Sequence, residues 1–279
     1  MKGFIVAGSL FMLPWTAWAL GCADLDSASK IRAFVESTKA ANPLWHDNLS
    51  VHLELSPCEK EECARKNRKL RKANIQNLHL VRLGTKRRAF VVKGPRAPQC
   101  SVTRGGRNFL CAECQYTANR ACRSFVRKGR ASGIPGTNID ASDFDLLTGK
   151  NFKTVCQEFP QNPKYFKLLS TRDKGDSPYD TIVSFYEAKR GIPITVNYLA
   201  GGSLRKVYRF FPKYYVQLNG QWIATIIRAR TTRGSEKRYI FETQIRVLSG
   251  GGKQPRFYFD PKDDPVLSGQ SIERLFNTN

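Results

Sequence analysis

Apolar and polar residues alternate along the second half of the chain with the period of two that is typical of half-buried strands. The alternation is clearest from Ile192 to Tyr198 and from Tyr239 to Val247. Glycine-containing turns divide the segment, and glycine supplies the positive φ that tight hairpins need. These turns are Ala200-Gly201-Gly202, Asn219-Gly220 and Arg233-Gly234-Ser235. The pattern from Gly191 to Val247 therefore predicts four strands in an antiparallel meander.

Helical spacing replaces this alternation near the N-terminus, where Ile31, Phe34 and Val35 fall on one face of a predicted helix over residues 27–41. Ser27 or Ser29 can cap this helix, and Asn42-Pro43 ends it. Alternation predicts further strands at 49–55, 77–83, 88–92, 101–111 (a hairpin), 152–159, 165–170, 181–187 and 257–259. Residues 59–73, 138–147 and 271–276 read as short helical segments.

The first 19 residues have the pattern of an export signal. Lys2 precedes an apolar run from Phe4 to Leu13, and Ala17-Trp18-Ala19 forms a cleavage site. The run is too short to span a bilayer, so we expect a periplasmic protein. In the alternative, Ala19 to Cys22 is a lipobox and the protein is lipid-anchored through Cys22. Cleavage after Ala19 leaves eight cysteines, whereas acylation leaves an odd number for pairing.

All eight cysteines lie in the first 156 residues, and export favours their oxidation to disulfides. Local closure predicts a bond between Cys58 and Cys63, and bonds within the set Cys100, Cys111, Cys114 and Cys122. The set Cys100, Cys111, Cys114 and Cys122 also suits a zinc site, although it contains a single C-x-x-C. A thioredoxin-like redox pair at Cys111 and Cys114 lacks the strand-helix-strand context. The connectivity stays open, because eight cysteines can pair in many ways.

The chain is strongly basic, with 46 Lys and Arg against 23 Asp and Glu. Lys2 is the only charged residue of the predicted signal, so the mature chain would carry a net charge of +22. Residues 58–130 hold 20 of the basic residues and 4 acidic ones. Such a surface attracts an anionic membrane or envelope polymer, although it equally fits an ordinary solvated face. Nucleic acid is not expected as a partner, because the basic clusters lack interleaved aromatic residues.

The sequence contains no recognisable catalytic motif, and we expect neither an enzyme nor a bound cofactor or metal. The three histidines, His46, His52 and His79, look isolated, and His52 falls on the polar face of its strand. Asp263 and Asp264 lie between two prolines and look like part of a turn. Asp140, Asp143 and Asp145 could form an acidic cluster, but helix capping explains Asp140 and the phrase around it.

The order of these features resembles the outer-membrane lipoprotein-sorting protein family, the periplasmic carriers with a LolA-like fold. The shared pieces are the Ile192-Pro193 strand, the Gly201 to Lys206 hairpin, the Gly220-Gln221-Trp222 phrase, the Tyr239 to Ile245 strand and the phrase from Gly133 to Leu147. The resemblance covers the chain from about residue 29 onward and implies an α+β fold: a curved antiparallel sheet forming a half-open β-barrel with a helical lid. No linker divides the chain, so residues 20–279 would be a single domain, with a cysteine-rich basic insertion around 58–130.

The resemblance also implies a function. A groove under the helical lid would bind lipid or the acyl chains of a lipoprotein during lipoprotein sorting or lipid transport, with a possible membrane-protein partner. Its candidate lining residues are aromatic: Phe34, Phe144, Phe185, Tyr198, Phe210, Trp222 and Tyr239. The same residues also suit an ordinary packed core. The alternative function is a non-catalytic envelope protein that docks on anionic polymer, membrane or a partner protein through its basic surface.

Overall fold

The computed structural model of the protein describes residues 20–46, 48–59, 75–84, 87–93, 99–104, 107–111, 122–125, 134, 137–139, 152–175, 177–232, 239–250 and 254–267. In residues 87–125 and 239–240 it describes the backbone. The helices are η1 (Cys22–Leu25), α1 (Ala28–Thr38), η2 (Lys39–Ala41), η4 (Pro212–Tyr214) and η6 (Pro261–Asp263). In this part of the chain, no helix is long and apolar enough to cross a membrane.

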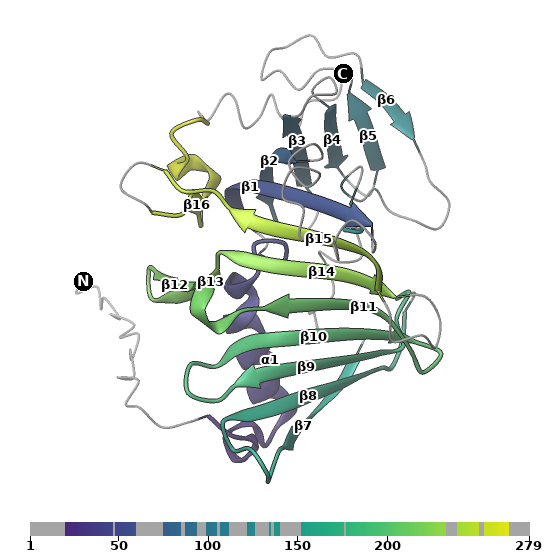
Figure 1. The fold of residues 1–279 in the computed structure, drawn as a ribbon, viewed down its shortest axis with the longest axis vertical. Helices are drawn as coiled ribbons and strands as arrows, with labels where there is room; N and C mark the ends of the chain where they lie inside the picture. Colours follow the sequence, from purple (N-terminus) through teal and green to yellow (C-terminus); the bar gives the residue numbers. More distant parts are fainter. Residues whose placement is uncertain are drawn as a thin grey trace, which may run out of the picture.

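Most of the described residues belong to strands, drawn as arrows in Figure 1. The strands of the first half are β1 (Asn48–Glu59), β2 (Gln76–Leu83), β3 (Arg87–Lys93), β4 (Gln99–Arg104), β5 (Arg107–Cys111) and β6 (Cys122–Phe125). Those of the second half are β7 (Phe152–Glu158), β8 (Tyr165–Arg172), β9 (Thr181–Glu187), β10 (Ile192–Ala200), β11 (Ser203–Phe210), β12 (Tyr215–Leu218), β13 (Gln221–Ala224), β14 (Ile226–Thr232), β15 (Tyr239–Val247) and β16 (Phe257–Tyr258).

Two antiparallel meanders meet at the middle of one 14-stranded sheet. The order β6-β5-β4-β3-β2-β1-β15-β14-β11-β10-β9-β8-β7 shows that the chain runs outward from β1, crosses to β7 and returns to β15. β16 pairs with β1 at Ser50 and Val51, beyond the end of β15. Because β6 and β7 stand at opposite ends of this order, the sheet is open.

The helix predicted from residue 27 is confirmed. Ser27 is the N-cap of α1, and its hydroxyl accepts a hydrogen bond from the backbone N–H of Lys30 at 3.3 Å. Ile31 and Phe34 are buried against the sheet, and α1 lies behind the strands of the second half in Figure 1. The second helix of the predicted lid, near Phe144, lies outside the described residues, as do the predicted signal peptide and the helix at 271–276.

The predicted turns at Gly201-Gly202 and Asn219-Gly220 are confirmed, and all four residues have positive φ. The third predicted turn lies outside the described residues. The meander is more broken than four strands, because η4 interrupts the second predicted strand and Thr225 interrupts the third. The cause is local: Pro212 has no N–H for a sheet hydrogen bond. The hairpin β12–β13 therefore forms a separate two-stranded sheet.

The core lies on one face of the sheet, here called the inner face, which carries α1. A large cluster of buried side chains covers the middle of this face, from Leu49, Val51, Leu53 and Leu55 of β1 to Val196 of β10. A second, smaller cluster joins α1 to β8 and β9. The opposite, outer face carries the alternate residues of each strand.

Candidate functional site

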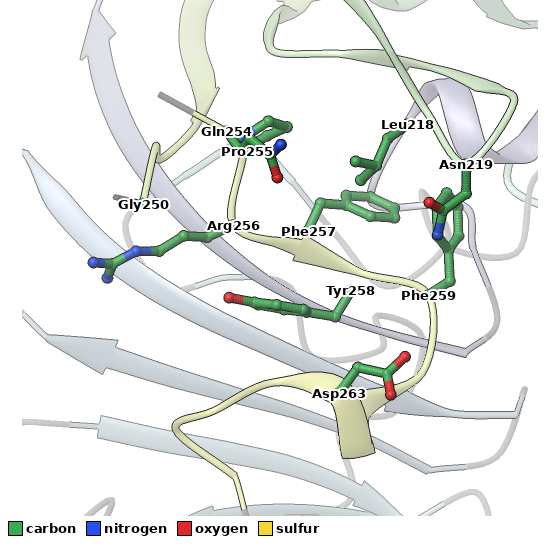
Figure 2. Close-up of a pocket in the computed structure, with 10 residues that line it drawn as sticks. All are labelled: Leu218, Asn219, Gly250, Gln254, Pro255, Arg256, Phe257, Tyr258, Phe259 and Asp263. Atoms are coloured by element: carbon green, nitrogen blue, oxygen red, sulfur yellow. The ribbon is translucent and has the colours of Figure 1, made fainter. Parts of the chain in front are cut away.

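A pocket of about 340 Å³ opens between the hairpin β12–β13 and the segment that contains β16 (Figure 2). Its walls are formed by two chain segments that are distant in sequence. The lining residues are Leu218, Asn219, Gly250, Gln254, Pro255, Arg256, Phe257, Tyr258, Phe259 and Asp263. Its volume lies at the lower end of the range of small-molecule pockets, about 300–1,000 Å³.

The floor of this pocket is apolar and continuous with the core. Phe257 is buried in the large cluster, and Leu218 and Phe259 pack against that cluster. The rings of Phe257 and Phe259 lie 5.1 Å apart. His46 lies beside them, with its ring 5.5 Å from that of Phe259. A ligand in the pocket would therefore contact the surface of the core directly.

The hairpin that forms one wall is firmly attached to the sheet. The Tyr215 hydroxyl donates a hydrogen bond to the carbonyl of Pro193 at 2.6 Å, and burial raises the pKa of Tyr215 well above its ordinary value. Thr225 donates both its N–H and its hydroxyl to the carbonyl of Tyr214. The Arg190 guanidinium lies 5.4 Å from the Trp222 ring, and its hydrogen bond to Glu187 raises its own pKa. This wall is thus preformed.

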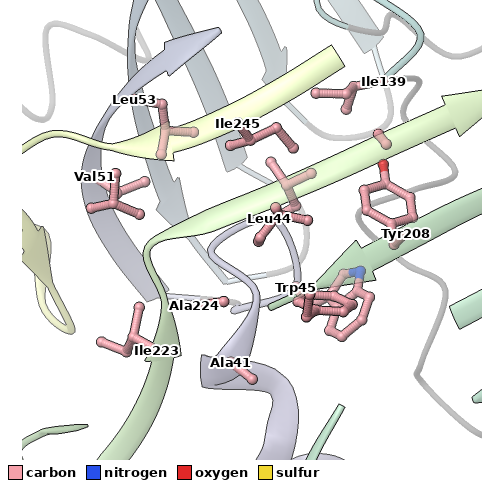
Figure 3. Packing of buried hydrophobic residues seen from close by; sticks show 14 of the residues in the cluster. Ala41, Leu44, Trp45, Val51, Leu53, Ile139, Tyr208, Ile223, Ala224 and Ile245 are labelled. Carbon is pink, nitrogen blue, oxygen red and sulfur yellow. The ribbon is translucent and has the colours of Figure 1, made fainter. Parts of the chain in front are cut away.

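Behind the pocket, residues 41–46, here called the plug segment, insert into the inner face after η2 (Figure 3). Ala41, Leu44 and Trp45 are almost fully buried. Buried Arg82 holds the segment by donating a hydrogen bond from Nη1 to the Leu44 carbonyl at 2.9 Å. The plug segment therefore separates the pocket from the aromatic part of the core.

A row of aromatic rings extends across the inner face from the plug segment. The Trp45 ring lies 5.5 Å from Phe210 and 6.3 Å from Tyr208. Tyr208 in turn contacts Tyr198 at 5.9 Å, and Tyr198 contacts Tyr179 at 5.0 Å. All these distances fall within or close to the range in which aromatic pairs attract one another.

Residues 134 and 137–139, here called the crossing segment, cover the inner face over β14 and β15. Ile134 and Ile139 are buried in the large cluster. Asn138 donates hydrogen bonds from Nδ2 to the Ala229 carbonyl at 3.1 Å and to Thr231 Oγ1 at 3.0 Å. The start of the phrase that runs from Gly133 to Leu147 thus docks on the sheet.

The smaller cluster attaches α1 to the other end of the sheet. The Phe34 ring lies 4.9 Å from Tyr186 and 5.6 Å from Phe166. Burial raises the pKa of Tyr186 to about 12. The Tyr186 hydroxyl is therefore neutral at physiological pH. Together α1, the plug segment and the crossing segment form the cover of the inner face.

A disulfide links η1 to the edge strand β7: Cys22 and Cys156 are bonded, at a sequence separation of 134. This pair is not among the predicted local pairs. Acylation of Cys22 would need the same sulfur atom, so the two modifications exclude one another.

Cys58 is also in a disulfide, and its partner is a cysteine whose side chain lies outside the described part of the chain. The register places Cys100, Cys111 and Cys122 in one row across β4, β5 and β6. The disulfide pairing of these three cysteines, and of Cys63 and Cys114, stays a prediction.

Comparison with known proteins gives a likeness of fold. No family model and no curated protein matches the sequence. The crystal structure of a DUF1329 family protein from Desulfovibrio piger is similar, with a TM-score of 0.54 and 12% identity over 77% of this chain and 88% of that one. A LolA superfamily protein from Nitrosomonas europaea has a TM-score of 0.50 and 10% identity over 77% and 90% of the two chains. The chain has a LolA-like fold.

A structure described as an outer membrane lipoprotein-sorting protein domain, from Vibrio parahaemolyticus, has 13% identity over 88% of this chain and 98% of that one. Its TM-score is 0.49. The likeness to the LolA superfamily protein from Nitrosomonas europaea confirms the resemblance found in the sequence as a LolA-like α+β fold, with an open antiparallel sheet and α1 on its inner face. At such low identities the likeness concerns the fold alone.

The LolA-like arrangement brings some of the predicted groove residues together. Tyr198 and Phe210 lie in the large cluster, Trp222 packs against it, and Phe34 lies in the neighbouring cluster under α1. Phe185 lies on the outer face, stacked 5.7 Å from Phe159, because its neighbour Tyr186 takes the inner face. Phe144 and the side chain of Tyr239 lie outside the described part of the structure. The pocket residues Leu218, Phe257 and Phe259 were missed by sequence reasoning.

The prediction that the histidines are isolated is wrong for His52 and His79. The two residues are direct cross-strand partners on β1 and β2, and their rings stack 4.1 Å apart. The Nε2 atom of each ring lies 3.1 Å from Oδ2 of Asp264. Asp264 is therefore not a simple turn residue: it directly follows η6, and it is buried.

In the cluster of His52, His79 and Asp264, burial and hydrogen bonding act on the pKa of Asp264 in opposite directions. Burial would raise the pKa of Asp264, but hydrogen bonds from His52, His79, Ser50 and the Val266 N–H outweigh burial and hold that pKa well below its usual range. Both histidines contact Asp264 through Nε2, and Ser50 also lies on Nε2 of His79, at 2.7 Å. A catalytic Ser-His-Asp relay uses the two different ring nitrogens. The cluster is thus not arranged as a catalytic triad.

Proposed function

We propose that the protein is a non-enzymatic, exported periplasmic carrier that binds an acyl chain of a lipid or lipoprotein. The acyl chain would enter the pocket beside β16. It would then extend along the inner face, in the space that the plug segment now fills. The observation that supports this proposal is the continuity of the pocket floor with the large core cluster through Leu218, Phe257 and Phe259. The resemblance of the sequence to the lipoprotein-sorting family and the LolA-like fold support it.

The free energy for binding would come from burial of apolar surface, about 0.8 kcal/mol for each methylene group. Two polar side chains of the plug segment favour its displacement by an acyl chain. Trp45 Nε1 and Asn42 Nδ2 are buried without a hydrogen-bond partner among the described residues. Each such group costs about 1–3 kcal/mol, and movement of the plug segment would relieve that cost. At the rim, Arg256 is exposed and can pair with an anionic headgroup.

Replacing Leu218 by glutamine tests the pocket. The change places an amide on the apolar floor, and we expect the affinity for a phospholipid to fall about tenfold, equivalent to about 1.4 kcal/mol. Native mass spectrometry of delipidated protein titrated with phosphatidylglycerol measures the bound fraction. The control is Val155→Gln, which changes an apolar side chain that is 44% exposed on the edge strand β7. Equal lipid binding by both variants would place the acyl chain elsewhere.

Ionic strength separates this function from docking of the basic surface on an anionic membrane or polymer. Exposed charges are screened over about 10 Å at 0.1 M salt, so surface docking weakens steeply as salt is added. An acyl chain in the pocket would stay bound. If phosphatidylglycerol dissociates from the wild-type protein at 0.5 M salt, the docking function replaces the carrier function.

A further inference from the structure

A second constellation, on the outer face, is unrelated to the pocket floor. Ser50 and His52 project from β1, His79 projects from β2, and Asp264 follows η6. The alternation of β1 explains this placement, because Leu49, Val51 and Leu53 point to the inner face and Ser50 and His52 to the other. Three distant parts of the chain therefore bring their polar atoms to one point.

The convergence is on a single atom, Oδ2 of Asp264. His52 Nε2 and His79 Nε2 each lie 3.1 Å from it, and the Ser50 hydroxyl donates to it. A carboxylate oxygen offers about two lone-pair sites, whereas three polar atoms, from Ser50, His52 and His79, lie against this one oxygen. The other oxygen, Oδ1, accepts from the Val266 N–H at 2.9 Å, which fixes the direction of the carboxylate.

We propose that His52, His79 and Asp264 form a binding site for one divalent transition-metal ion, with Zn²⁺ as the best fit. The ligand atoms would be Nε2 of both histidines and Oδ2 of Asp264, all of which lie within 4.8 Å of one another. The Ser50 hydroxyl or a water molecule would complete four-coordination.

The two histidine-to-carboxylate distances suit this ion. Zinc bonds to histidine nitrogen and carboxylate oxygen are about 2.0–2.2 Å long, so the ligand atoms of a tetrahedral site stand roughly 3.3 Å apart. The two N···O separations of 3.1 Å are close to that value. Two imidazoles and one carboxylate are ligands that zinc accepts. Each neutral ring would carry its proton on Nδ1 when Nε2 binds the ion.

The site is nearly closed to solvent. The side chains of Asp264 and His79 are 0% and 4% exposed, and that of His52 is 14% exposed, so an ion would enter past His52. The ion would tie the segment after β16 to β1 and β2. Because Phe257, Tyr258, Phe259 and Asp263 of this segment line the pocket, metal binding would also steady one pocket wall.

The test uses the untagged, oxidised, full-length mature protein. The protein is dialysed against ZnCl₂ and then against metal-free buffer, and elemental mass spectrometry should find one zinc ion per chain. Isothermal titration calorimetry measures the affinity for Zn²⁺. We expect His52→Gln, His79→Gln and Asp264→Asn each to weaken binding more than tenfold. His46→Gln removes the remaining histidine of the chain and should leave the affinity unchanged.

Circular dichroism shows which variants fold, and His52→Gln is the decisive one because its side chain is partly exposed. Co²⁺ in place of Zn²⁺ gives a visible spectrum that reports four-coordination by nitrogen and oxygen, and this spectrum should vanish in His52→Gln. The proposal is overturned if the folded oxidised protein binds no stoichiometric Zn²⁺. It is equally overturned if folded His52→Gln binds as tightly as the wild type, which would place the ion at another site. Neither result decides whether a lipid binds in the pocket.

Discussion

Replacement of Trp45 by alanine is expected to lower the free energy of unfolding by about 3–5 kcal/mol, because it removes a large, fully buried ring and leaves a cavity. Trp45 is 2% exposed and contacts Tyr208 and Phe210 on the inner face. Urea denaturation followed by circular dichroism measures the change. The matched control is Phe185→Ala, which removes a half-buried aromatic ring from the outer face and should cost less than about 2 kcal/mol.

The same variant has an expected effect on lipid binding. Without the indole ring, the plug segment leaves space beside the aromatic row, and the folded Trp45→Ala protein should bind phospholipid more tightly than the wild type. Trp45→Phe retains most of the apolar surface and removes the N–H that has no partner among the described residues, so its stability should stay close to that of the wild type. Weaker lipid binding by folded Trp45→Ala would contradict the role given to the plug segment.

Loss of the Cys22–Cys156 bond is the second large effect. The double variant Cys22→Ser/Cys156→Ser is expected to lose about 3–5 kcal/mol of stability, because the bond closes a loop of 134 residues in the unfolded chain. The bond also joins η1 to the edge strand β7, close to the hydrogen bond from Leu20 N–H to the Ala188 carbonyl. The midpoint of chemical denaturation under oxidising conditions measures the loss.

A control is needed for the remaining disulfides. Intact mass and thiol titration of both proteins show whether the other cysteines stay oxidised, so that the difference reports this one bond. An unchanged denaturation midpoint would mean that Cys22 and Cys156 are not bonded in the protein. A wild-type mass raised by two or three acyl chains would mean that Cys22 is acylated instead.

Local sequence was enough to predict the elements. Alternation located β1, β2 and β7 to β11, and the glycines at 201, 202 and 220 located two hairpins, because strands and tight turns depend on near neighbours. The sheet order depends on distant contacts. Leu53 faces Val247 across β1 and β15, and no local pattern in the chain encodes that pair.

The site was less predictable for the same reason. Alternation divides β9 into two faces without naming the inner one, so Phe185 was proposed where Tyr186 is found. The cluster of His52, His79 and Asp264 requires both the register of β1 on β2 and the return of the chain more than 180 residues later. One signal was present: two histidines on consecutive predicted strands of one antiparallel pair.

Cross-linking with a phospholipid that carries a photoreactive diazirine near the end of one acyl chain tests the carrier function most directly. After irradiation and digestion, peptide mass spectrometry locates the attached tail. We expect adducts on residues 215–222 and 254–259, which include most of the residues that line the pocket, and further adducts on residues 41–46 as the plug segment is displaced. Adducts confined to the outer face, or to the basic residues between 58 and 130, would contradict it.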